Sequence, residues 1–310
     1  MIILVFLITF KVLFIMFPGV ILTAAREGLV LWLNSIMPAL LPFMIITNML
    51  VSLGFARYLG EFLSPVTKKI FCLPGAGGFA LITGLTSGYP IGAKTVADLR
   101  MSGELSKSDA QHLLAFCNNA GPLFILGVVG VGFFGSPAIG YVLWAGHVFS
   151  ALLLGVLLRF VPFIKKQEGS KNIRITPSCK FSISPGKAFG DSVRNAMESM
   201  TIIGGLVIFF SAVMAALGEI GLPDTGLLAG LIAGIIEVTS GVSKISESGV
   251  STASLGFAAF AIAFGGLSIH MQALHFTEGT GIKAIPYIIC KVLHGILAFA
   301  ITIFLARLFV

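Results

Sequence analysis

Charged residues are scarce in this sequence. They make up 11% of the 310 residues, against 56% hydrophobic residues, and the mean hydropathy is +1.02. Soluble domains carry about a quarter charged residues, so this composition excludes a water-soluble fold. The apolar stretches are about 20 residues long and show no ten-residue alternation of the kind found in membrane β-strands. The sequence therefore predicts an all-α polytopic membrane protein whose main partner is the lipid bilayer.

Cysteines and catalytic motifs are also sparse. The sequence contains no CxxC or Cys/His spacing that could hold zinc, and its four cysteines are read as small apolar residues: Cys72, Cys117, Cys179 and Cys290. There is no Ser/His/Asp set, HExxH motif, phosphate loop or pair of catalytic carboxylates. We therefore expect no metal site, no cofactor and no enzymatic activity.

Acidic residues, 13 in number, are outnumbered by 20 basic ones. The basic residues are not interleaved with aromatics on a soluble face, so nucleic acid is not an expected partner. Seven of them lie in or beside the polar stretch 162–190, which the positive-inside rule places in the cytoplasm. Counting from a cytoplasmic N-terminus puts fifteen of the 20 basic residues on the cytoplasmic side, two within spans, and three outside: Arg26, Lys244 and Arg307.

Seven full spans are predicted, at 2–22, 29–54, 110–134, 137–160, 192–217, 253–276 and 284–308. The first lacks the basic region and cleavage site of a secretion signal, so we expect a retained helix. Two further apolar stretches, 70–92 and 223–243, are rich in glycine and predict re-entrant hairpins. The expected organisation is an N-terminal membrane helix (1–27), a first repeat (28–161), a basic cytoplasmic loop (162–190) and a second repeat (191–310).

The order of features is the same on both sides of the basic loop. Each side has a long helix, a TSG triplet, an interrupted helix and a helix with one histidine, His147 or His294. Each unit holds three spans and one hairpin, and an odd number of spans gives the two units opposite orientations in the membrane. This is the inverted-repeat design of secondary transporters. The alternative is a chance likeness between glycine-rich apolar segments.

Polar residues at the expected hairpin tips and helix breaks are the candidate solute site. Unpaired amides at a helix start attract anions, and buried amide side chains need a polar cavity or another helix. The alternatives are hydroxyls that bond back to the preceding turn and glycines that only allow close packing. The candidates are Thr86, Ser87, Gly88 and Tyr89, then Asn118 and Asn119, then Thr239, Ser240 and Gly241, and Ser268.

Ionisable residues in or beside the predicted spans are candidates for coupling or gating. They are Glu237, Lys94, His270 and Lys291. For His147 and His294 we favour simple hydrogen bonding between helices. The sequence contains no carboxylate-rich sodium site, so it does not identify a coupling ion.

The run from Ser87 to Phe134, SGYPIGAKTVADLRMSGELSKSDAQHLLAFCNNAGPLFILGVVGVGFF, resembles the signature stretch of the YlbJ or SpoVV family of sporulation integral membrane proteins. That family lies within the wider group with nucleoside-recognition, or Gate, domains. The group resembles concentrative nucleoside transporters, in which two hairpins and two broken helices enclose the solute. By position, this implies hairpin roles for the residues of the two TSG triplets and broken-helix roles for Asn118, Asn119 and Ser268.

The resemblance also implies a solute and a place. It implies transport of dipicolinic acid from the mother cell across the outer forespore membrane, with the small anion as partner. A nucleoside or other metabolite is an alternative solute, although Glu237 is the one clear counterpart of the acidic residues that bind nucleosides in those transporters. A non-transporting protein of spore-envelope assembly is the alternative from another class.

Overall fold

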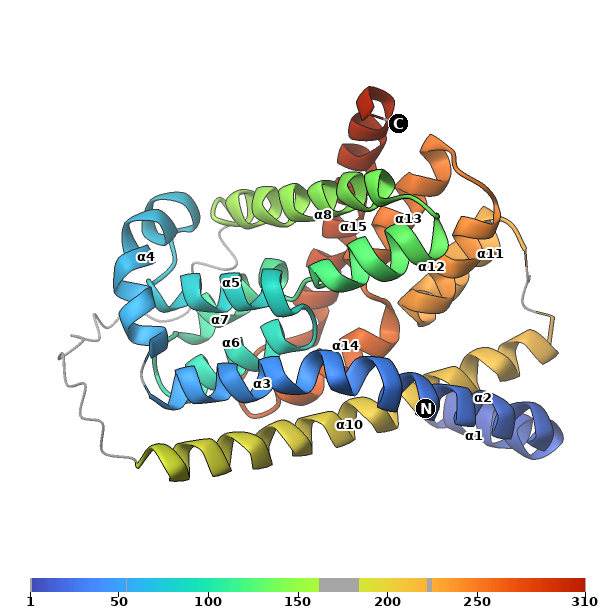
Figure 1. Ribbon diagram of the computed structural model, residues 1–310, viewed down its shortest axis with the longest axis horizontal. Coiled ribbons are helices and arrows are strands. Elements are labelled where there is room, and N and C mark those ends of the chain that lie inside the picture. The colour runs from blue at the N-terminus through green and yellow to red at the C-terminus, as the bar shows by residue number, and fades with distance from the viewer. Residues whose placement is uncertain (1, 54, 162–183, 222–224, 310) are drawn as a thin grey trace.

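The computed structural model describes residues 2–53, 55–161, 184–221 and 225–309, and within these ranges every regular element is a helix (Figure 1). In chain order the helices are α1 (Ile2–Met16), α2 (Pro18–Leu31), the π-helical η1 (Trp32–Ile36), α3 (Met37–Ser52), α4 (Phe55–Phe71), α5 (Ala76–Ser87), α6 (Ile91–Met101), α7 (Lys107–Cys117), the π-helical η2 (Leu123–Phe133), α8 (Pro137–Leu158), α10 (Pro185–Glu219), α11 (Leu227–Ile236), α12 (Val238–Glu247), α13 (Thr252–Phe264), α14 (Gly266–Phe276) and α15 (Ala284–Phe309). Most of the basic loop, 162–183, lies outside the described residues.

The first apolar stretch is bent. α1 ends at Met16 and α2 starts at Pro18, whose ring has no N–H and therefore suits the first position of a helix. The axes on either side differ by 106°. The helix then continues through η1 and α3 to Ser52, so Arg26 lies inside α2. The predicted single span 2–22 followed by a loop is therefore wrong, and the expected domain boundary after residue 27 falls within a helix.

Fewer helices than predicted are long and apolar enough to cross a membrane. Among the described residues there are four such stretches, α8, α10, α15 and the α13–α14 pair over Thr252–Phe276. The bent pairs α1–α2 and α4–α5 bring the number to six if each is one span. The predicted span 110–134 is interrupted at residues 118–122, between α7 and η2, which leaves two helices of 11 residues each.

Each expected hairpin contains a break between two short helices, but both helix pairs run past the predicted ends at 92 and 243, since α6 ends at Met101 and α12 at Glu247. In the first, α5 packs on α6 across the turn at Gly88–Pro90; in the second, α11 packs on α12 across Glu237. Glycine allows close contacts here: a Cβ on Gly84 would overlap the carbonyl of Cys117 at the end of α7, and one on Gly241 would overlap the backbone of Gly234.

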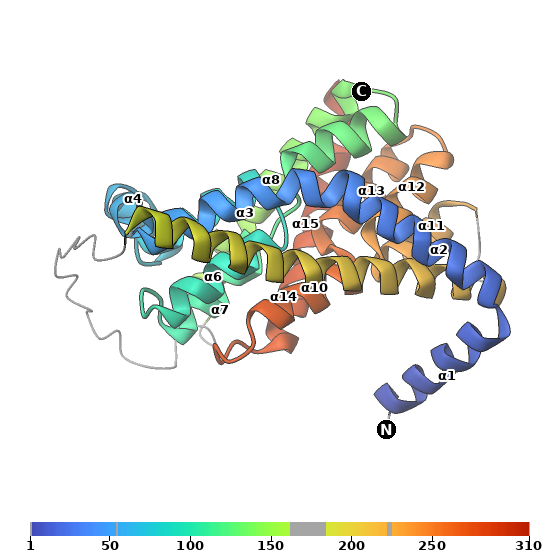
Figure 2. The same ribbon diagram turned by 60° about the horizontal axis from the view of Figure 1, so that its bottom comes forward.

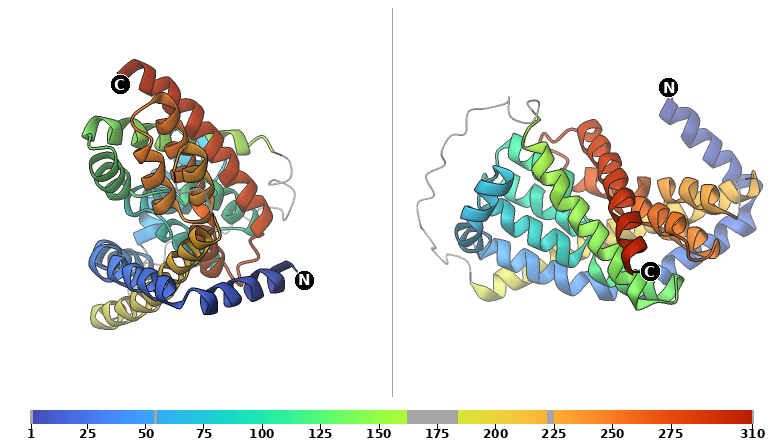
Figure 3. Two further views of the ribbon diagram at one scale, coloured as in Figure 1. Left: turned by 90° about the vertical axis from the view of Figure 1, so that its right-hand side faces the viewer. Right: turned by 90° about the horizontal axis from the view of Figure 1, so that it is seen from above.

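The two halves of the chain use the same helix pairings. α5 packs on α6 and α7, and α7 packs on α8; likewise α11 packs on α12 and α13, and α13 packs on α15. The contacts between the halves also correspond. α7 packs on α15 as α13 packs on α8, and α6 packs on α14 as α12 packs on η2. α8 and α15 lie side by side, and α10 runs along α2 and α3 (Figures 2 and 3).

Hydrogen bonds join the two halves at one end of the molecule. The Gln111 side chain accepts from N–H of Lys283 at 2.6 Å and donates to its carbonyl at 3.2 Å, and Nε of Arg100 donates to the carbonyl of Thr280 at 3.4 Å. The turn after α6 and the loop before α15 are thus on the same side of the molecule.

Candidate functional site

Two helix breaks meet in each half of the molecule. In the first half, Gly88 after α5 has φ +83°, and a Cβ there would lie 2.5 Å from N of Gly121 in the α7–η2 break. In the second half, Gly266 between α13 and α14 would place a Cβ 3.1 Å from the carbonyl of Ile236 and 3.2 Å from N of Val238. Four helix ends therefore lie close together in each half. Helix ends have backbone N–H and C=O groups without partners in the helix, whereas the interior of a continuous helix has none.

Asn118 and Asn119 lie at the α7–η2 break and are fully buried. Nδ2 of Asn118 donates to Oη of Tyr287 on α15 at 2.8 Å, and Nδ2 of Asn119 donates to the carbonyl of Phe116 at 2.8 Å. The side-chain oxygens of both asparagines have no partner. Each amide is thus half satisfied, which leaves two buried acceptors at the break.

Lys291 on α15 is buried beside the same break. Its Nζ donates to the carbonyl of Asn118 at 2.9 Å and lies 3.0 Å from Nδ1 of His294. Lys291 thereby contacts the carbonyl of the residue that caps α7, beside the negative end of that helix.

His147 and His294 bond between helices, as expected. Nε2 of His147 accepts from N–H of Ala120 at 3.1 Å, and Nε2 of His294 lies 3.3 Å from the carbonyl of His147. With Lys291 donating to Nδ1 of His294, the proton of a neutral His294 is on Nε2 and points at that carbonyl. Nδ1 of His147 is left as a buried donor without a partner.

His270 and Tyr89 add further polar atoms without partners. Both ring nitrogens of His270 are buried and unbonded, and its ring stands edge-on to Phe264 and Tyr287, with centroids 4.5 and 5.4 Å away. Oη of Tyr89 is also buried and unbonded. These unpartnered groups come from both halves of the chain.

The first TSG triplet is placed differently from the expectation. Thr86 and Ser87 are the last residues of α5, so they lie at the negative end of a helix and not at the positive end that attracts anions. The Thr86 hydroxyl donates to the carbonyl of Ile82 at 2.8 Å, which is the local bonding that we had set against a solute role. The helix that starts here is α6, at Ile91, and it has no side-chain cap.

The second triplet lies at a helix start, but its donors are taken. The Glu237 carboxylate accepts from N–H of Thr239 at 3.0 Å, and from N–H and Oγ of Ser240 at 2.7 and 2.8 Å. The expectation of unpaired amides at Thr239 and Ser240 is therefore wrong, because Glu237 caps α12 with its own carboxylate. Gly241 is inside α12 and packs on Gly234.

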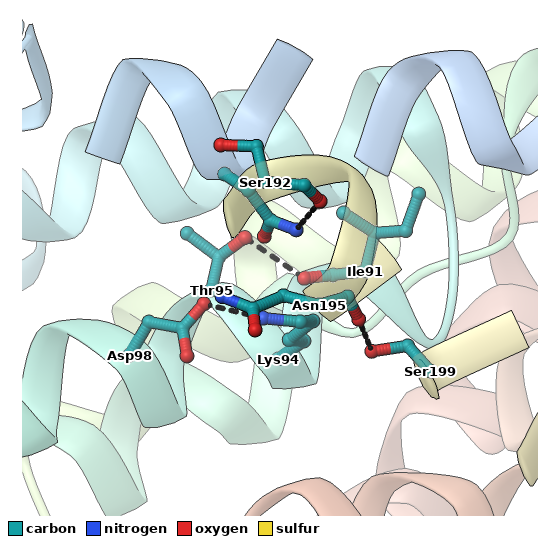
Figure 4. Close-up of polar contacts among 8 residues, drawn as sticks. Ile91, Lys94, Thr95, Asp98, Ser192, Asn195 and Ser199 are labelled. Atoms are coloured by element: carbon teal, nitrogen blue, oxygen red, sulfur yellow. Dashed lines mark hydrogen bonds and ion pairs between the residues drawn. The ribbon is translucent and has the colours of Figure 1, made fainter. Parts of the chain in front are cut away.

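Lys94 belongs to a second polar group between α3, α6 and α10 (Figure 4). Nζ of Lys94 forms an ion pair with Asp98 at 2.8 Å, one helical turn away. The hydroxyls of Thr95 and Ser199 donate within their own helices. Asn48 links α3 to α10 through the carbonyl of Ser192 at 3.2 Å. Lys94 is thus not among the residues gathered around Lys291.

Ser268 is buried on α14, near the break at Gly265. Among the described residues, no group of three or more His, Cys, Asp or Glu side chains is placed to hold a metal ion. Tyr287 was not a predicted site residue, although it bonds Asn118 and contacts His270. The signal was its spacing, since Tyr287, Lys291 and His294 are at i, i+4 and i+7 and share one face of α15.

The sequence is similar to a described family and to a sporulation protein. The Gate family model, described as nucleoside recognition, matches residues 33–137. The sporulation integral membrane protein YlbJ of Bacillus subtilis (strain 168) is 31% identical over 313 residues, and the match covers 91% of this chain and 76% of that protein. No solved structure matches the chain.

Proposed function

Because the chain belongs to the family of the sporulation integral membrane protein YlbJ, we propose that it is a secondary transporter for a small carboxylate, dipicolinate, in the outer forespore membrane. The N-terminus and the stretch 162–190 are cytoplasmic in this proposal, and the two halves form an inverted repeat with α5–α6 and α11–α12 as re-entrant hairpins. The matching helix pairings of the two halves support this arrangement.

One observation carries the proposal. Buried polar atoms without partners are rare in native proteins and call for an explanation. Of the eight such side-chain atoms in the described part of the chain, six lie at or beside the broken helices: Oη of Tyr89, Oδ1 of Asn118 and Asn119, Nδ1 of His147, and both ring nitrogens of His270. The other two are Nε1 of Trp32 and Oγ1 of Thr302. Polar groups inside a membrane are costly to bury without hydrogen-bond partners, and they are typical of a solute pathway. A bound solute would supply the missing partners.

The second hairpin suggests how a carboxylate binds in the first. Glu237 places a carboxylate on the start of α12, and the corresponding start of α6 at Ile91 has no side-chain cap. A solute carboxylate at α6 would occupy the position that Glu237 occupies in the second half, beside the unbonded Tyr89 hydroxyl. The favourable end of the α6 dipole and the nearby hydroxyl would offset part of the lost hydration.

A nucleoside is the second candidate solute. The Gate family carries the description of nucleoside recognition, and the free oxygens of Asn118 and Asn119 are acceptors that suit the hydroxyl and amino donors of a nucleoside. A carboxylate brings no donor for these oxygens, so dipicolinate would bond the same amides through Nδ2 after the side chain turns over.

The test is solute exchange in proteoliposomes that contain the purified full chain. We expect labelled dipicolinate to exchange with unlabelled dipicolinate inside the vesicles, and uridine to compete poorly. Exchange of uridine in place of dipicolinate would show that the solute is a nucleoside. Exchange of neither, together with normal dipicolinate in spores of a deletion strain, would favour a non-transporting role in spore-envelope assembly.

A further inference from the structure

Lys291 is a buried lysine whose hydrogen-bond partners carry no negative charge. In the described part of the chain its hydrogen bonds go to the carbonyl of Asn118 and the imidazole of His294, and no carboxylate pairs with it. An ammonium group inside a membrane protein is expensive to bury and normally faces a partner of opposite charge. The partner here is a helix end.

The carbonyl that Lys291 binds is the C-cap of a broken helix. α7 ends at Cys117, Asn118 follows as its cap, and the chain does not resume a helix until η2 begins at Leu123. The final carbonyls of α7 have no following turn to bond them, and the helix dipole is negative at this end. The site therefore has the chemistry of a cation site, with Nζ of Lys291 in the position of the cation.

The titratable side chains around Lys291 are histidines and cysteines. They are Cys117 on α7, His147 on α8, His270 on α14, and Cys290 and His294 on α15 itself. None is a carboxylate. A positive charge on Lys291 would thus be balanced by oriented dipoles and would repel a second cation at the same helix end.

In transporters with broken helices, unwound carbonyls and half-helix C-terminal ends coordinate the coupling cation. We propose that Lys291 is a tethered cation that replaces a free coupling ion at the broken end of α7, so that the carrier binds no sodium there. The expected consequence, solute exchange without sodium, rests on the proposed transport function. The structural claim, that Lys291 occupies the end of α7, does not depend on any solute.

The first experiment uses the unaltered protein. Its thermal unfolding midpoint is measured in detergent in sodium chloride and in choline chloride at equal ionic strength, because choline is too large for a carbonyl site. We expect the same midpoint in both salts. A midpoint raised by sodium over choline would mean that a free cation site exists, and the proposal would be overturned.

The second experiment removes the tethered cation. Lys291→Ala leaves the α7 end open, so we expect its midpoint in choline to fall by at least about 3 °C, and sodium or methylammonium to restore part of the loss. Lys187→Ala, at an exposed lysine on α10, is the matched control and should respond to neither cation. A Lys291→Ala protein as stable as the control, or destabilised without any response to small cations, would show that Lys291 only fills space.

The two proposals fail separately. Should proteoliposomes carry neither solute while the stability results hold, the transport function is wrong and the tethered cation stands. Should dipicolinate exchange require sodium outside or inside the vesicles, transport stands and the tethered cation is wrong. Equal dipicolinate exchange in sodium and in choline is the result that both proposals expect.

Discussion

His147 on α8 and His294 on α15 face each other with ring centroids 4.9 Å apart, and Nε2 of His294 is 3.3 Å from the carbonyl of His147. Each histidine occupies the third helical segment after the hairpin of its half. The contact between them therefore joins matching segments of the two halves of the chain. Lys291 joins this contact to the α7 break through His294.

Removing the imidazole of His294 should lower stability. In His294→Ala, Nζ of Lys291 loses a buried acceptor, and we expect a loss of about 1–3 kcal/mol, the usual cost of an unmet buried polar group. His275→Ala on α14 removes an exposed histidine and serves as the control. The measurement is thermal unfolding in detergent, and equal midpoints for the two variants would contradict the role given to His294.

Asn118 and Tyr287 should be energetically coupled. Tyr287→Phe keeps the ring against His270 but removes the oxygen that accepts from Nδ2 of Asn118. We expect Asn118→Leu and Tyr287→Phe each to destabilise, and the double variant to cost less than their sum by about 0.5–3 kcal/mol. Tyr141→Phe, at an exposed tyrosine on α8, should have little effect. Strict additivity in this double-mutant cycle would show that the bond contributes nothing.

Asn119 tests the solute pathway. Asn119→Leu removes an unpartnered buried oxygen and adds apolar surface, so membrane insertion should hold. We expect dipicolinate exchange to fall at least about tenfold, equivalent to ~1.4 kcal/mol. The amount of protein in the membrane is measured in parallel. Wild-type exchange at wild-type abundance would make Asn119 a packing residue.

The hairpin glycines are predicted to be folding positions. A methyl group on Gly241 would overlap the backbone of Gly234, so Gly241→Ala should reduce both the folded yield and the unfolding midpoint. Gly205→Ala on α10 meets nothing within 4 Å and should be neutral or stabilising, because alanine favours helix over glycine. Equal yields of the two variants would contradict the close contact between α11 and α12.

Topology can be tested with single cysteines in a background with Cys72 and Cys179 replaced by serine. Gly186→Cys, at the exposed start of α10, should be labelled only after the cytoplasmic face is opened. Val250→Cys, exposed between α12 and α13, should be labelled from outside. The reason is the excess of basic residues on the cytoplasmic side. Labelling of both positions from the same side would remove the inverted-repeat arrangement.

Long apolar runs predicted the straight helices well. α8, α10 and α15 contain the predicted spans apart from one or two residues at an end of 137–160, because unbroken hydrophobic length is itself the physical requirement for crossing a bilayer. Bends were harder. The turn at Pro18 was missed because the residues on both sides of it are apolar as far as Leu22, and hydropathy records composition and not direction.

The matching TSG letters were a misleading guide to the site. Gly88 follows the end of α5 with φ +83°, whereas Gly241 lies inside α12, so the two TSG glycines are not in corresponding places. Which amides are free depends on which side chain reaches them, and Glu237 reaches the start of α12 through a backbone conformation that periodicity does not reveal. Asn118, Asn119, His270 and Lys291, by contrast, were predicted as candidates from the cost of polar groups in a membrane, and the structure brings them together.

The exchange of packing between the two halves sets a limit on how the chain can be divided. α7 lies on α15 and α13 lies on α8, so the stretch up to α8 produced alone would expose the surface that α13 and α15 normally cover, and the stretch from α10 onward would expose its complement. Neither fragment holds a complete interior. Two polypeptides cut between α8 and α10 should consequently be degraded when made singly and accumulate when made together, as the subunits of an obligate heterodimer do.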